Sequence, residues 1–214
     1  MGKSKAHQTY HTQDGIKVPG VTTILGIMAK PALVGWANRL GLEGIEVGKY
    51  VDNLADIGTL AHAMIEAHFK GEKFNSDDYS KNQIDKAENS VLKFYEWEKQ
   101  HKIKVIGTEL QLVSQEHGFG GTCDLVCELD GVPTLIDFKT CKAIYDEAHT
   151  QACAYAMLLA ENGKPVEQIK ILRIGRDETE GFEDITITKE SLHIKRFLAC
   201  LEVYNINKQL KKKE

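Results

Sequence analysis

The chain has 214 residues, of which 42% are hydrophobic and 27% charged, so it can bury a sizeable core as one globular domain with a helical elaboration. Its formal net charge of −4 gives no overall basic field for nucleic acid, although a site rich in carboxylates can hide a basic groove in that sum. Five unevenly spaced cysteines indicate a reducing compartment, and the sequence shows neither a signal peptide nor the run of about 18 apolar residues that a membrane span needs.

The first part of the chain, residues 1–103, is predicted to be mainly helical. VPGVTTIL at 18–25 contains a Pro-Gly turn in an extended entry and leads towards a helix. Helices are expected at about 31–41, 46–70 and 77–101, each with apolar residues at helical spacing or a Pro or Gly at a boundary.

From residue 104 the pattern changes to short apolar runs separated by turn residues. Strands are expected at 104–114, 122–128, 134–138, 169–174 and 185–188, and helices at 146–162 and 189–211. This order predicts an α/β fold of the α+β type, with a mixed sheet and flanking helices. We expect residues 104–214 to form the mixed-sheet core and residues 1–214 to form one domain.

The second and third of these strands are joined by Asp130-Gly131, the sequence of a two-residue type I′ hairpin turn. With that turn, paired residues have numbers that add to 261. Asp124 and Asp137 then face each other, with Cβ atoms roughly 5 Å apart. Lys139 lies two residues beyond Asp137 and points to the same face.

Two opposed carboxylates repel each other unless a positive charge lies between them. Oxygen ligands of this kind suit Mg²⁺ or Mn²⁺, and Lys139 would stand beside the ion, where an ammonium can orient a water or stabilise charge on a phosphate. The alternative is an ordinary surface face that carries an Asp/Lys pair, and a one-residue slip in the turn would remove the opposition.

Four short motifs follow one another in the order found in a known family. They are Gly58-Thr59-Leu60-Ala61-His62, Gly121-Thr122-Cys123-Asp124, Ile136-Asp137-Phe138-Lys139-Thr140, and Gln151 with Tyr155 one helical turn later. On these motifs the chain, over about residues 18–160, resembles the PD-(D/E)xK nuclease superfamily, and more narrowly its RecB-like exonuclease branch with the phage and mitochondrial genome-maintenance members. The resemblance implies a restriction-endonuclease-like core.

The resemblance also implies roles for individual residues. Asp124, Asp137, His62 and the carbonyl of Phe138 are expected to bind the metal. Asp124, Asp137, Lys139 and Gln151 are expected to be catalytic, while Glu109, Thr140 and Tyr155 are expected on the substrate side. The cofactor is expected to be Mg²⁺ or Mn²⁺, and no iron–sulfur cluster is expected because the cysteines lack the layout of that variant.

The resemblance therefore implies a metal-dependent DNase, an exonuclease acting on single-stranded DNA or DNA with a free end, in recombination, replication or repair. It would work in the cytoplasm of a bacterial or phage-infected cell, with no membrane contact and with recombination or replication proteins as further partners. Two alternatives stay open, namely a catalytically silent nucleic-acid-binding subunit of the same fold and an endonuclease.

Three further side chains are given ordinary structural interpretations. Trp36 is expected in the core rather than as a platform for a base. Arg173 and Arg176 are expected on the solvated surface.

Overall fold

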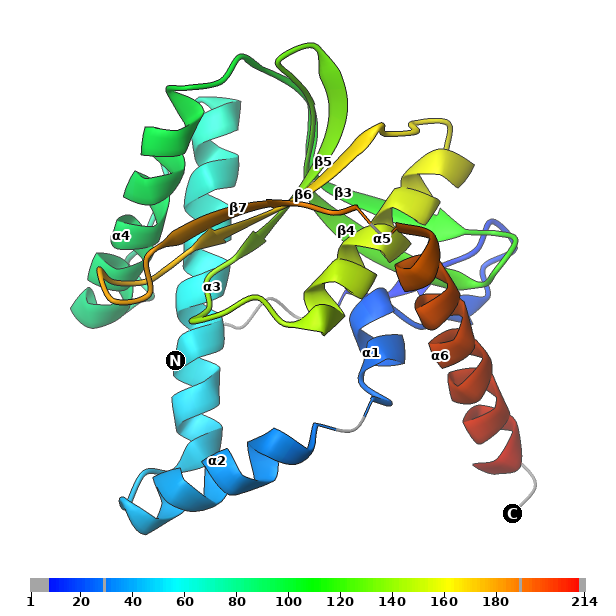
Figure 1. Ribbon diagram of the computed structural model, residues 1–214, viewed down its shortest axis with the longest axis horizontal. Helices are drawn as coiled ribbons and strands as arrows, with labels where there is room; N and C mark the ends of the chain where they lie inside the picture. The colour runs from blue at the N-terminus through cyan, green and yellow to red at the C-terminus, as the bar shows by residue number, and fades with distance from the viewer. Residues whose placement is uncertain (1–7, 29, 189, 212–214) are drawn as a thin grey trace.

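A five-stranded mixed sheet lies at the centre of the computed structural model, which describes residues 8–28, 30–188 and 190–211 (Figure 1). Its strand order is β3-β4-β5-β6-β7, and only β5 and β6 are parallel neighbours. The strands are β3 (Ile103–Ser114), β4 (Phe119–Leu129), β5 (Val132–Lys139), β6 (Gln168–Ile174) and β7 (Phe182–Thr186). The sheet and its helices confirm the predicted fold class and element order.

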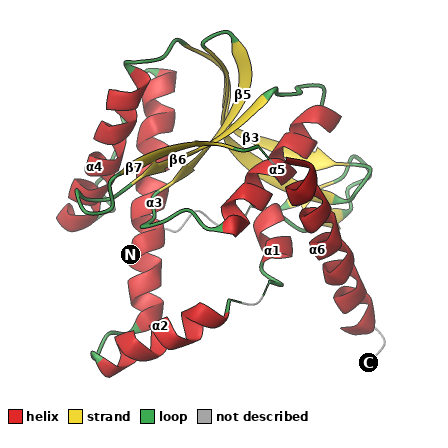
Figure 2. Ribbon diagram, in the orientation of Figure 1, coloured by secondary structure: helices red, strands yellow, loops and turns green. Residues whose placement is uncertain are grey.

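Helices cover both faces of this sheet (Figure 2). The sheet therefore lies between two clusters of buried side chains. On one side pack α1 (Val21–Leu25), α5 (Asp146–Glu161) and α6 (Glu190–Lys211). On the other side pack α3 (Val47–Lys70) and α4 (Lys81–Glu98). The remaining helix, α2 (Pro31–Leu42), contains no buried residue and extends away from the sheet (Figure 1).

The position of β5 in the middle of the sheet explains why its sequence is so apolar. All five residues from Thr134 to Phe138 are buried because helices lie on both faces of the sheet. Leu135 belongs to the cluster with α5, whereas Ile136 and Phe138 belong to the cluster with α3 and α4. Helix α5 provides the connection from β5 to its parallel neighbour β6.

Local capping signals set the ends of the two helices on the α3/α4 side. Gly71 ends α3 in a left-handed conformation with φ 67°, as its sequence position predicts. Ser80 and Gln83 form a reciprocal capping box that starts α4 at Lys81, four residues later than expected from the apolar pattern. Because α4 also ends at Glu98, the predicted helix over 77–101 was too long at both ends.

A small hairpin of β1 (Tyr10–His11) and β2 (Lys17–Val18) precedes the helices and was not predicted. Its Tyr10 hydroxyl lies 2.9 Å from the Thr122 hydroxyl, and the Gly120 N–H donates to the Pro19 carbonyl at 2.9 Å. These contacts attach the N-terminal segment to β4. Across the described residues, no helix has both the length and the apolar character that a bilayer span requires.

Candidate active site

The β4–β5 hairpin has the turn and the register that the sequence predicts. Asp130 and Gly131 both have positive φ, 51° and 90°, as a type I′ turn requires. The Asp130 carboxylate accepts from the Lys102 N–H at 2.7 Å, which anchors the turn to the start of β3. Pairing runs from Leu129 opposite Val132 to Leu125 opposite Ile136.

Asp124 and Asp137 occupy the next positions beyond the last paired residues of that ladder. The Asp124 carboxylate accepts a hydrogen bond from the backbone N–H of Phe138 at 2.8 Å, so it bridges to the neighbouring strand. The Asp124 side chain is 14% exposed and that of Asp137 only 1%. One acid therefore lines the surface of the site and the other lies at its floor.

The Asp137 carboxylate is the most unusual group in the site. Lys139 Nζ lies 2.5 Å from its Oδ2, which confirms that the two side chains share a face. Neither carboxylate oxygen has a hydrogen bond of ordinary geometry to any described residue, although both are buried. Buried carboxylates normally have hydrogen-bond partners or coordinate a metal, so the site has coordination capacity that the protein leaves unused.

Burial and neighbouring charge shift the pKa values of the two acids in opposite directions. Burial raises the pKa of Asp137 to about 6, and the Asp124 charge adds to this, although Lys139 opposes it. Burial also acts to raise the pKa of Asp124, but His62, Lys139 and the Phe138 N–H lower it by more. Asp124 is thus the more readily ionised of the two carboxyls.

The same acids raise the pKa values of the two basic groups of the site. Burial acts to lower the pKa of Lys139, but Asp137 and Asp124 raise it above the ordinary value. Burial likewise acts to lower the pKa of His62, and Asp124 raises it by more. The site is therefore a compact set of opposite charges in a protein environment that excludes most water.

His62 reaches this site because α3 packs tightly against the end of β5. A Cβ at Gly58 would lie 2.7 Å from the Thr140 hydroxyl oxygen, so only glycine permits this approach without a shift. His62 lies one turn later on the same face of α3, with Nδ1 3.5 Å from Asp124 Oδ1 and its ring against Phe138. In the motif at residues 58–62, the glycine therefore allows α3 to approach β5 closely, and the histidine extends into the site.

The group best placed to hold a cation consists of His62, Glu109 and Asp124. One ligand atom from each lies within 4.8 Å of the others. A carboxylate pair with one imidazole suits Mn²⁺ or Mg²⁺, with imidazole favouring Mn²⁺. Glu109, which the sequence placed on the substrate side, thus joins the candidate ligands, while ligation by Asp137 and by the Phe138 carbonyl stays a prediction.

Glu109 is presented by an unusual backbone conformation. Its φ of 49° is left-handed, which is uncommon for a residue other than glycine and often marks a functional position. The pairing of β3 with β4 places Thr108 opposite Leu125 and Leu110 opposite Cys123, with Glu109 between them opposite Asp124. The pairing of β3 with β4 therefore brings the two carboxylates to neighbouring positions.

The alternation of side chains along β4 also breaks at Asp124. Phe119 and Cys123 pack in the cluster with α5, whereas Leu125 and Cys127 pack in the cluster with α3 and α4. All four have odd numbers, so a regular strand would place them on one face. The break at Asp124 lets its carboxylate reach towards His62 on α3.

Gln151 and Tyr155 approach the site from α5. The Gln151 amide donates to the Tyr155 hydroxyl at 2.8 Å. A Cβ at Gly121 would lie 2.7 Å from the Tyr155 ring, which explains the glycine of the second motif as a close contact between β4 and α5. Burial raises the pKa of Tyr155 well above its ordinary value, and Asp137 adds to this, so the phenol stays protonated.

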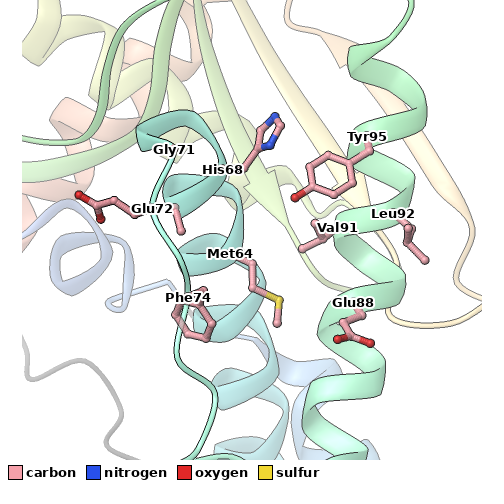
Figure 3. Close-up of a pocket in the computed structure, with 10 residues that line it drawn as sticks. Met64, His68, Gly71, Glu72, Phe74, Glu88, Val91, Leu92 and Tyr95 are labelled. Carbon is pink, nitrogen blue, oxygen red and sulfur yellow. The ribbon is translucent and has the colours of Figure 1, made fainter.

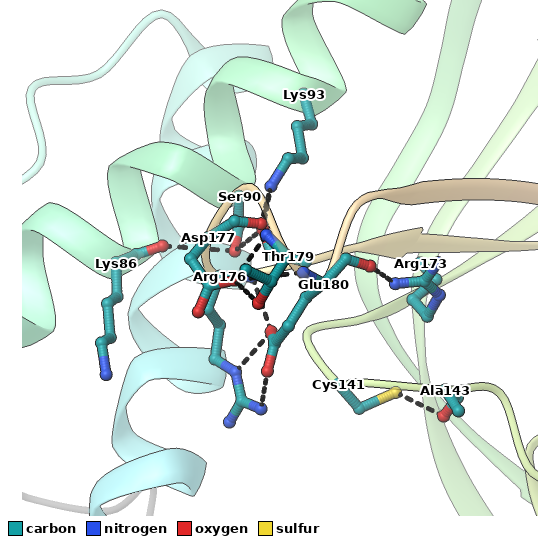
Figure 4. A network of polar contacts seen from close by, with 11 residues as sticks. Lys86, Ser90, Lys93, Cys141, Ala143, Arg173, Arg176, Asp177, Thr179 and Glu180 are labelled. Atoms are coloured by element: carbon teal, nitrogen blue, oxygen red, sulfur yellow. Dashed lines mark hydrogen bonds and ion pairs between the residues drawn. The ribbon is translucent and has the colours of Figure 1, made fainter.

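Two arginines expected on the surface are instead buried beside the site. Arg173 donates through Nε to Glu183 at 2.7 Å. Arg176 binds Glu180 through Nε and Nη2 at 2.9 and 2.5 Å, as Figure 4 shows. Lys93 of α4 donates to the carbonyls of Gly175 and Asp177, which fixes the β6–β7 loop. The sequence showed a charged loop that contains Glu180, but not the contacts from Lys93 of α4 and Glu183 of β7 that accompany the burial of the two arginines.

A hollow on the α3/α4 side of the sheet is separate from these residues. It measures about 560 Å³ and lies between α3 and α4 (Figure 3). Its lining comprises Met64, Ala67, His68, Gly71, Glu72, Phe74, Glu88, Val91, Leu92 and Tyr95. None of the site residues lines it, so this hollow does not mark the position of the chemistry.

The sequence and the fold are both similar to those of known nucleases. A model of the PD-(D/E)XK nuclease superfamily matches residues 36–201. An exonuclease candidate from Eubacterium rectale shares 14% identity, with 72% of this chain and 66% of that chain covered at a TM-score of 0.48. An alkaline exonuclease from Laribacter hongkongensis shares 14% identity, with coverage of 75% and 87% at a TM-score of 0.33. No curated protein matches the sequence.

Proposed function

The chain belongs to the PD-(D/E)XK nuclease superfamily, and from this premise we propose that it is a metal-dependent deoxyribonuclease that hydrolyses phosphodiester bonds from DNA ends. One observation carries the proposal. The buried Asp137 carboxylate lies beside Lys139 and Asp124 and has no hydrogen bond of ordinary geometry within the described structure.

The residues present fit a divalent cation. His62, Glu109 and Asp124 offer one nitrogen and two oxygen ligands within 4.8 Å of one another, and Asp137 supplies further carboxylate oxygens at the floor of the site. When bound there, Mg²⁺ or Mn²⁺ would polarise the phosphate and favour ionisation of a water. We assign Asp124 and Asp137 as ligands, with His62, Glu109 and the Phe138 carbonyl completing the set.

The chain's own groups act on the rest of the reaction. The Lys139 ammonium, held by Asp137, is positioned to orient the attacking water and to stabilise negative charge on the phosphate. The Gln151 amide and the protonated Tyr155 hydroxyl form a polar pair on α5 that can contact the substrate backbone. Thr140 follows Lys139 directly and packs against Gly58, so it supports the lysine-bearing end of β5.

The central test is cleavage of labelled linear DNA with Mg²⁺ or Mn²⁺, compared with EDTA. Lys139→Ala is expected to lower the rate at least about 100-fold, the usual scale of losing a group that stabilises developing charge. Lys142→Ala is the matched control, because Lys142 is exposed and lies three residues further on. Equal rates for the two variants would remove Lys139 from the mechanism.

Closed circular single-stranded DNA separates the exonuclease from the endonuclease alternative. An enzyme that needs an end leaves the circle intact and degrades the linear form. Degradation of circles would count against the exonuclease assignment. DNA binding that persists in EDTA with no product under any metal would instead support the catalytically silent subunit. By resemblance we place the activity in DNA recombination, replication or repair.

A further inference from the structure

An arm made of α2 and the start of α3, residues 47–53, contributes nothing to the buried clusters. Helix α2 has no buried residue, and the first buried residue of α3 is Ile57. Leu33, Val34 and Leu42 of α2 are all at least half exposed. The arm extends away from the sheet (Figure 1), so packing of the core does not explain its apolar side chains.

Two aromatic rings pair with each other on this arm. The centroids of Trp36 and Tyr50 lie 6.2 Å apart with planes at 55°, and Tyr50 is 39% exposed. Trp36 is partly exposed and belongs to neither buried cluster, so its expected place in the core was wrong. The other tryptophan, Trp97, is buried and donates to Asp184 at 2.9 Å.

Through Tyr50, the aromatic pair shares a helix with a residue of the candidate active site. Tyr50 and His62 are on the same helix, about 18 Å apart at 1.5 Å per residue. Arg176 lies two residues beyond the end of β6, the strand whose Arg173 pairs with Lys139 of β5.

Arg176 is held rigidly in this position. Glu180 accepts from its backbone N–H and from Nε and Nη2, and the third guanidinium nitrogen points away from Glu180 (Figure 4). Ser90 and Lys93 of α4 both donate to the Gly175 carbonyl next to it. A guanidinium fixed in this way can recognise a phosphate at little conformational cost.

Taking the nuclease function above as its basis, we propose that Trp36 and Tyr50 form a stacking subsite for bases of a single DNA strand that leads into the active site. A base stacks only after it has left its duplex partner, so this subsite accepts a single strand or a frayed end rather than an intact duplex. Stacking on aromatic rings tolerates any base, which suits an enzyme without a sequence-reading element. The remaining guanidinium nitrogen of Arg176 would donate a hydrogen bond to a phosphate of the same strand.

The experiment measures binding of a fluorescent oligothymidylate by anisotropy, once with Ca²⁺ and once with EDTA, alongside cleavage of linear DNA with Mg²⁺. Trp36→Ala and Tyr50→Ala are each expected to weaken binding about 5- to 150-fold, the range for losing one base–aromatic stack. Val34→Ala is the matched control, because Val34 is 74% exposed on the same helix, and it should bind like the wild type.

Two further measurements separate stacking from other roles. A strand of the same length with abasic sites has no bases to stack, so wild type and Trp36→Ala should bind it equally. Trp36→Phe should retain binding of the thymidylate strand but lose the quenching of tryptophan fluorescence, because buried Trp97 remains shielded.

Each outcome decides the proposal. Unchanged thymidylate affinity of Trp36→Ala in a protein that still cleaves DNA would overturn the stacking subsite alone. A changed oligomeric state of Trp36→Ala in gel filtration would also overturn it, because the arm would then be an interface between copies. A wild-type protein that neither binds nor cleaves DNA would overturn both this inference and the proposed function.

Discussion

Replacement of Asp137 by Asn should stabilise the metal-free protein while it abolishes cleavage. Burial raises the pKa of this carboxyl from 3.8 to about 6, with Asp124 adding to the effect. The folded state thus binds the proton more tightly than the unfolded state does. The amide of Asn resembles the protonated acid in shape and carries no charge, so the variant avoids the cost of a buried carboxylate.

The size of the effect follows from the two pKa values. The interval from 3.8 to about 6 corresponds to about 3 kcal/mol of destabilisation when Asp137 is ionised. The destabilisation is absent below pH 3.8, grows as the pH rises towards 6 and is complete above that. The reason is that at high pH the folded state must release a proton that it binds more tightly than the unfolded state does. For a chain of this length, about 3 kcal/mol raises Tm by roughly 6–12 °C.

Thermal unfolding in EDTA at several pH values measures this effect. The gain of Asp137→Asn over wild type should be large well above pH 6 and vanish near pH 3.8. Glu178→Gln is the control, because Glu178 is exposed, and its Tm should match wild type. With Mn²⁺ at about 100 times its Kd, wild type should gain about 2.7 kcal/mol and the variant less.

The reasoning would be refuted by an Asp137→Asn protein that melts below wild type in EDTA at high pH. That result would mean that the Lys139 pair outweighs the burial cost, and that the carboxylate is a structural ion pair rather than a metal ligand held at a cost to stability. A pH-independent gain would also refute it, because the proton linkage would then be absent.

Three other predictions concern packing and reactivity. Gly121→Ala should destabilise the folded protein by about 1–3 kcal/mol in urea unfolding and lower the rate of cleavage, because the added Cβ would lie 2.7 Å from the Tyr155 ring. Gly35→Ala is the control: a Cβ there meets open space, so the substitution should stabilise the protein by about 0.5–1 kcal/mol. A thiol reagent should modify only Cys141 quickly in the folded protein and all five cysteines after unfolding, because the other four are buried; rapid reaction of two or more would contradict the structure. Phe94→Ala should cost about 3–5 kcal/mol, since this fully buried ring packs against Phe138 and Trp97, and a loss below 1 kcal/mol would be inconsistent with that core.

The sequence alone determined the features that depend on neighbouring residues. Asp130-Gly131 specifies a turn with two positive φ angles, and the turn sets the register that carries Asp124 and Asp137 to adjacent positions. Period-two alternation places Lys139 on the face of Asp137. Helix ends marked by a capping residue, such as Gly71, were likewise readable because the signal lies within one turn.

The tertiary structure decided which distant groups meet these residues. Glu109, which has a left-handed backbone, meets Asp124 through the pairing of β3 with β4 and meets His62 through the packing of α3. Arg176 is buried rather than solvated because Ser90 and Lys93 of α4 fix the loop in which it pairs with Glu180.

Trp36 lies outside the core because α2 packs on no face of the sheet. No local pattern encodes such meetings. They depend on how whole helices and strands pack, and that packing is the sum of many weak contacts between residues far apart in the chain.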